Sequence, residues 1–108
     1  MAKLEKVIDG DFDALLARIE RGLLEGGVSA APEDSSDFRE GGARCSVRVF
    51  ERFSYTGANR LRMNLTLFQG CGGPVHLSAV TAGGGPAPFV RTGAWGEEAF
   101  LEKLRKLL

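Results

Sequence analysis

The sequence predicts an α+β domain with two layers, in which an antiparallel sheet of about five to six strands carries two helices on one face. Three observations lead to this prediction. Apolar residues recur with a helical period near both ends of the chain, they alternate with polar residues in the middle, and short glycine-containing segments connect the alternating runs. We expect a single domain over residues 1–108, with the element order β-α-β-β-β-β-β-α.

Each predicted helix has one apolar stripe. The helix of the N-terminal region covers residues 11–27, with Asp11 at the N-cap and Gly26-Gly27 as a left-handed stop. Its stripe consists of Phe12, Leu15, Leu16, Ile19 and Leu23. The C-terminal helix covers residues 95–108, and we expect Glu97 and Glu98 in its first turn, where the helix dipole favours negative charge. Its stripe consists of Phe100, Leu101, Leu104 and Leu108.

Three segments between the helices alternate with a period of two, which is typical of strands with one buried face. They are residues 44–54, 60–68 and 75–82. The side chains that we expect to face the helices are Cys45, Val47, Val49, Phe53, Leu61, Met63, Leu65, Leu67, Val75, Leu77 and Ala79. The connections are too short for a parallel crossover, so these strands should pair as antiparallel neighbours. Shorter candidate strands are residues 3–8, 28–33 and 88–92.

The three glycines at residues 83–85 are interpreted as part of a hairpin rather than as a phosphate-binding loop. They lie between two predicted strands, where positive φ angles or a bulge are needed. The surrounding residues match neither of the common nucleotide-loop patterns.

The outer face of the sheet is the predicted functional surface. If Ser54 pairs with Arg60, then Arg52 lies opposite Arg62 and Phe50 lies opposite Asn64, and like charges across a ladder are unfavourable. Arginine forks suit carboxylates or phosphates, and an aromatic ring could stack on a ligand. The candidate binding residues are Arg48, Phe50, Arg52, Arg60, Arg62, Asn64 and His76.

Two other interpretations of this arginine-bearing face remain open. The arginines could extend into water or pair with acids such as Asp34 and Asp37 on a neighbouring segment. The same face also carries Phe50, Phe68 and small residues, so it could pack against a second subunit. We therefore expect a non-catalytic binding module or homodimer that uses this face, with a small anion as a possible ligand.

Composition argues against several functional classes. Fourteen basic and fourteen acidic residues cancel, which makes a nucleic-acid partner unlikely, and no apolar run is long enough to span a membrane. Cys45 and Cys71 form no metal or disulfide pattern, and the polar first residues do not resemble a signal peptide, so we expect a cytoplasmic protein. His76 is the only histidine, and we expect Cys45 to face the core, away from it. No catalytic residues, cofactor or metal are therefore predicted.

Two alternatives belong to other functional classes. A small enzyme or metabolite-binding protein would have a pocket between helices and sheet near Glu51, Tyr55 and Trp95. A weak nucleic-acid or anion binder would use the arginines of the outer face.

Four segments of the chain resemble a small family of uncharacterised bacterial proteins, described only as a domain of unknown function. The segments are "GDFDALLARI", "RVFERFS", "NRLRMNLTL" and "WGEEAFLEKL". The resemblance covers essentially the whole chain, and it rests mainly on the "VRVFER" strand and the "WGEEAFL" ending. It implies a free-standing cytoplasmic α+β protein, and it carries no activity or catalytic residue.

Overall fold

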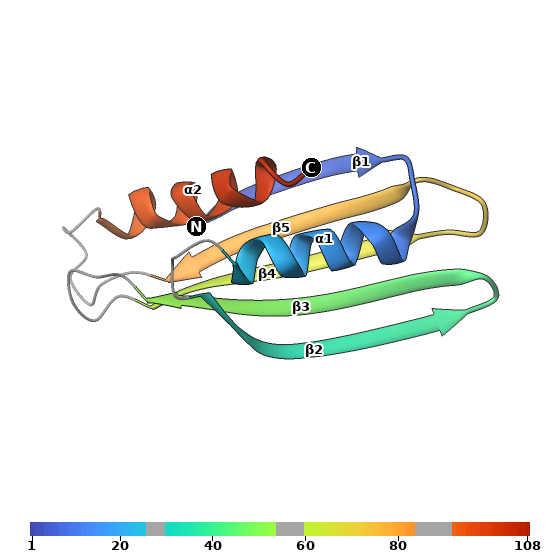
Figure 1. Ribbon diagram of the computed structural model, residues 1–108, viewed down its shortest axis with the longest axis horizontal. Coiled ribbons are helices and arrows are strands. Elements are labelled where there is room, and N and C mark those ends of the chain that lie inside the picture. Colours follow the sequence, from blue (N-terminus) through green and yellow to red (C-terminus); the bar gives the residue numbers. More distant parts are fainter. Residues whose placement is uncertain (26–29, 54–59, 84–91) are drawn as a thin grey trace.

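The protein is a five-stranded antiparallel sheet with two helices on one face. The computed structural model describes residues 1–25, 30–53, 60–83 and 92–108, with the backbone alone at Phe53 and at residues 92–95. The elements are β1 (Ala2–Ile8), α1 (Phe12–Leu24), β2 (Ala30–Glu40), β3 (Ala43–Phe53), β4 (Arg60–Gln69), β5 (Val75–Gly83) and α2 (Thr92–Arg105). The strand order in the sheet is β1-β5-β4-β3-β2. Both helices lie on the same side of the sheet, which confirms the two-layer α+β fold (Figure 1).

The predicted helix of the N-terminal region is confirmed in α1. The Asp11 side chain accepts a hydrogen bond of 2.8 Å from the Ala14 amide, so the N-cap forms as expected. All five residues of the predicted stripe are buried. The helix ends at Leu24, and Gly26-Gly27, the predicted stop, lies outside the described residues.

The C-terminal helix begins earlier than the sequence predicted. Since α2 starts at Thr92, Glu97 and Glu98 lie beyond its first turn, and their predicted place there is wrong. Glu97 is instead buried, with 5% of its surface exposed, and its carboxylate pairs with the Met1 ammonium group. A charged pair at this position links α2 to the start of β1.

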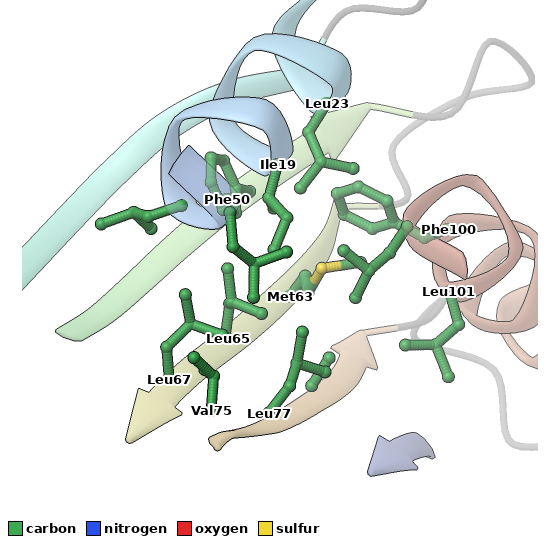
Figure 2. Close-up of a cluster of buried hydrophobic side chains, with 14 of the residues drawn as sticks. Ile19, Leu23, Phe50, Met63, Leu65, Leu67, Val75, Leu77, Phe100 and Leu101 are labelled. Carbon is green, nitrogen blue, oxygen red and sulfur yellow. The ribbon is translucent and has the colours of Figure 1, made fainter. Parts of the chain in front are cut away.

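The helices and the strands β3 to β5 enclose one apolar core (Figure 2). The largest fully buried side chains include Phe12, Ile19, Leu23, Phe50, Met63, Leu65, Leu67, Phe100, Leu101 and Leu104. No buried side-chain nitrogen or oxygen in the described part of the chain lacks a hydrogen-bond partner. The buried polar groups of the described core are therefore satisfied.

Strand β2 is longer than the predicted strand at residues 28–33, because it continues to Glu40. Nearly all of its residues are exposed, as expected of an edge strand. Its sequence is mostly polar, so it shows no alternation of apolar and polar residues from which a strand could be predicted. Gly41 and Gly42, with φ angles of 56° and 87°, close the hairpin to β3. The additional strand predicted at residues 88–92 falls mostly outside the described residues, and Thr92 begins α2.

The register between β3 and β4 differs from the predicted one by a single residue. Arg60 pairs with Phe53 rather than with Ser54, and Phe50 lies opposite Met63. Because side chains alternate, this shift turns every β3 side chain to the other face. Phe50 is 1% exposed beneath the helices, so the prediction that Val47 faces them and Phe50 faces outward is wrong. The predicted faces of β4 and β5 are confirmed, since Leu65 and Leu77 are buried in the core.

Gly83 is the last residue of β5 and lies opposite Leu61 of β4, where the backbone conformation requires glycine. Its φ angle is 131°, and an added Cβ would collide with the backbone of Arg60. We expect Gly83→Ala to lower the free energy of unfolding by about 2 kcal/mol or more, measured by urea denaturation. The matched control is Gly70→Ala, because a Cβ at Gly70 meets no atom within 4 Å. Equal stability of the two variants would contradict this account.

Candidate functional site

The seven predicted binding residues do not form one surface. Arg60, Arg62, Asn64 and His76 belong to the open face of the sheet, by which we mean the side opposite the helices. The other three, Arg48, Phe50 and Arg52, alternate onto the helix side with the buried Phe50, so their predicted place on the outer face is wrong. The physical reason is the one-residue change in register, which moves these three β3 residues together.

The arginines of the open face are neutralised by carboxylates. Arg62 donates two hydrogen bonds of 2.9 and 3.1 Å to Glu33, which lies at the bulge of β2. Glu51 lies directly opposite Arg62 in the ladder. It forms an ion pair with Arg60, in which the Arg60 Nε and Glu51 Oε1 atoms are 3.0 Å apart. The predicted opposition of Arg52 and Arg62 therefore does not occur, and the open face has no uncompensated basic patch on the described strands.

The arginines on the helix side of β3 connect the two layers. Arg44 makes two hydrogen bonds of 2.8 and 2.7 Å with Asp13 of α1, and its guanidinium carbon lies 4.2 Å from the centre of the Phe12 ring. Arg48 pairs with Asp37 at 3.0 Å and with Glu20 at 3.5 Å. These bidentate and cation–π contacts hold α1 over β3 and engage both arginines.

The clefts between helix and sheet lie beside Arg48. Two cavities of about 310 and 290 Å³ border this residue, lined by Glu20 and Ser35 in the first and by Asp13 and Asp37 in the second. Glu51, which the enzyme alternative placed in such a pocket, lies on the open face instead. Tyr55 and the side chain of Trp95 lie outside the described residues.

A row of side chains crosses the open face near one end of the sheet, and sequence reasoning placed only Phe68 and His76 of this row there. The register aligns one residue from each strand, and we call this set the transverse row: Phe38, Cys45, Phe68, His76 and Val7. Phe38, Phe68 and Val7 are 62%, 44% and 60% exposed, and they are three of the five exposed large hydrophobic residues in the described chain. The rings of Phe68 and His76 lie 6.3 Å apart. The row concentrates exposed apolar surface on a face without helices.

Shallow cavities lie on both sides of Phe68. One of about 490 Å³ is bordered by Phe38 and Cys45, and the other, of about 220 Å³, by Val7 and His76. Cys45 faces the open side and not the core, which corrects the prediction. It is still separated from His76 by β4, a spacing of about 10 Å, so the two do not form a catalytic pair.

A family model, described as a family of unknown function, matches residues 1–108. The chain belongs to the DUF6054 family. This result agrees with the resemblance of the "VRVFER" and "WGEEAFL" segments to an uncharacterised family. No curated protein matches the DUF6054 chain.

Neither described helix of the DUF6054 protein has the length and apolar character that crossing a bilayer requires. Among the described residues, no group of three or more His, Cys, Asp or Glu side chains could hold a metal ion. The transverse row is a cluster of exposed apolar side chains on the open face of the described DUF6054 chain.

The ion pairs around Asp37 predict a pH-dependent contribution to stability. The hydroxyl of Ser46, at 2.6 Å, and then the guanidinium of Arg48 hold the pKa of Asp37 below its ordinary value of 3.8. A lowered pKa stabilises the fold above the unfolded value, and this contribution is lost as pH falls through the folded pKa. We expect Asp37→Asn to destabilise the DUF6054 protein by about 0.5–1 kcal/mol at pH 7 in urea denaturation.

The difference between wild type and Asp37→Asn should disappear as pH falls below the folded pKa of Asp37. Glu98→Gln is the matched control, because it removes one negative charge from an exposed position on α2, away from the open face. If the two variants showed the same loss at pH 7, the pairing of Asp37 with Arg48 would contribute nothing.

Proposed function

We propose that this DUF6054 protein is a non-catalytic module that forms a homodimer through the open face of its sheet. The observation that carries the proposal is the transverse row, in which Phe38, Phe68 and Val7 are each at least 44% exposed. Exposed apolar side chains that gather on one face are typical of protein interaction sites. The ion pairs of Arg60 and Arg62 leave apolar contact as the main attraction of this face.

A second copy of the chain fits the pattern of side chains on the open face. A two-fold axis that runs parallel to β4, midway between the open faces of the two copies, would set β4 on the β4 of the other copy, β3 on β5, and β2 on β1. Each row across the sheet would then face the same row of the other copy. Phe68 would then pack on Phe68 of the second copy, at the centre of the contact between the two transverse rows.

Charges and apolar groups complement each other in the row that contains Asn64. This row is aligned as Asp34, Val49, Asn64, Val80 and Lys3. The same two-fold axis brings Val49 to the Val80 of the second copy. It also brings Asp34 to the second copy's Lys3, so opposite charges meet at both ends of the row.

The size of the face is sufficient for a specific contact. Five strands about 4.8 Å apart, paired over about seven residues, make a face of roughly 550 Å² on each subunit. The pair would bury on the order of 1,000 Å² in total, which is close to the lower limit for a specific interface. We place this role in the cytoplasm, because Cys45 and Cys71 are both free thiols.

Light scattering and sedimentation equilibrium test the dimer directly. We expect wild-type protein to have twice the chain mass of 11.6 kDa at micromolar concentration. Phe68→Glu should have the mass of a single chain, because it places a charge at the centre of the apolar contact. The matched control is Leu24→Glu, which changes another exposed hydrophobic residue, on α1, and should remain dimeric.

A wild-type protein with the mass of one chain at high concentration, or a dimeric Phe68→Glu variant, would contradict the proposal. A charge exchange tests the orientation of the two copies. Lys3→Glu should weaken the dimer, and the double variant Lys3→Glu/Asp34→Lys should restore it, because the exchanged charges still meet across the two-fold axis. If the double variant does not restore association, this two-fold axis is excluded. The dimer proposal would still stand on the mass measurements.

A further inference from the structure

Two basic side chains lie on the helix side of the sheet, and each contacts a residue of a helix: Arg52 contacts Phe100 of α2, and Lys103 contacts Leu23 of α1. Arg52 lies near the end of β3, opposite Leu61, and its guanidinium carbon is 5.8 Å from the centre of the Phe100 ring. Lys103 lies one turn after Phe100 on α2, and its ammonium group donates a hydrogen bond of 3.2 Å to the carbonyl oxygen of Leu23 at the end of α1. Both basic side chains are half-buried.

This pair differs from the other arginines of β3 and β4 in having no acidic partner. Arg44, Arg48, Arg60 and Arg62 each form an ion pair with a carboxylate. Within the described residues, no ion pair joins Arg52 or Lys103 to an Asp or Glu. Burial lowers the pKa of Lys103, and the positive charge of Arg52 lowers it further. Two like charges in a half-buried position repel each other unless an anion offsets them.

The donors of the two residues are only partly used. The guanidinium of Arg52 lies over the Phe100 ring, and within the described residues its N–H groups donate to no acidic side chain. Lys103 uses one of its three N–H donors on the Leu23 carbonyl. A planar fork beside a compact ammonium charge is the combination that binds the oxygens of a phosphate or carboxylate group.

We propose that Arg52 and Lys103 form a binding site for an oxyanion, supplied by the phosphate or carboxylate group of a small molecule. The bound anion accepts hydrogen bonds from the edge of the guanidinium and from the free donors of the ammonium group. It lies on the helix side of the sheet, so it does not depend on the dimer proposed for the open face.

An NMR titration with inorganic phosphate tests this site on the intact chain, with sodium chloride at matched ionic strength as the reference. We expect phosphate to shift the Nε–H resonance of Arg52 and the ε-methylene resonances of Lys103 in a saturable way, while chloride does not. A parallel titration with acetate distinguishes the two sources of the oxyanion, since the group that saturates at lower concentration is the preferred one.

Variants separate a binding site from a purely structural pair. Arg52→Gln and Lys103→Gln should each weaken phosphate binding at least tenfold, measured by the concentration that gives half of the shift. The matched control is Arg105→Gln, which removes one positive charge from α2 where it pairs with Glu102, and should bind like wild type. If Lys103→Gln does not fold because the end of α1 loses its hydrogen bond, wild type and Arg52→Gln, which keeps that hydrogen bond, are compared by thermal shift in phosphate and chloride.

Three results would overturn the proposal. These are wild-type protein whose Arg52 and Lys103 resonances do not respond to phosphate, a response equal to that in chloride, and an Arg52→Gln variant that binds phosphate as wild type does. In each case the two residues would serve only to pack α2 against the ends of α1 and β3.

Discussion

The register between β3 and β4 is the constraint on which the rest of the structure depends. It places Phe50 opposite Met63, where its large aromatic side chain is buried in the apolar core. Full burial of a phenylalanine contributes about 1.5–3 kcal/mol, so a slip of one residue, which would expose this ring, is strongly disfavoured. The same parity carries Arg48 and Arg52 to the helix side. The location of these two positive charges on the helix side therefore follows from the burial of Phe50.

Each face of the sheet then satisfies its charges in its own way. On the helix side, acids of α1 and β2 pair with Arg44 and Arg48 and hold the layers together. On the open face, Glu33 and Glu51 neutralise the arginines of β4. What remains after this pairing is an exposed apolar row on one side and two basic groups without acidic partners on the other. Both proposals follow from these unpaired features, and neither follows from the arginine content alone.

The sequence predicted most of the fold, and its errors have identifiable physical causes. The α1 stripe and the faces of β4 and β5 were predictable because their apolar residues follow one periodicity. The faces of β3 were not predictable, because its apolar residues alternate onto both faces: Val47 and Val49 lie on one face and Phe50 on the other. The sequence of the segment that connects β3 to β4 does not define the register by itself. The polar residues 34–40 hid the edge strand β2. Phe38 was therefore not aligned with Cys45, although the Gly41-Gly42 hairpin was a usable signal.

The most direct test of this account is a nuclear Overhauser measurement of the contacts of Phe50. The register described here predicts strong contacts between its ring protons and the methyl group of Met63. It also predicts that Val49 lies beside Asn64 across the ladder. Contacts of the Phe50 ring with the side chain of Asn64, together with contacts of Val49 with the leucine methyl groups of the core, would show the alternative register. They would remove the basis for both the open face and the basic pair.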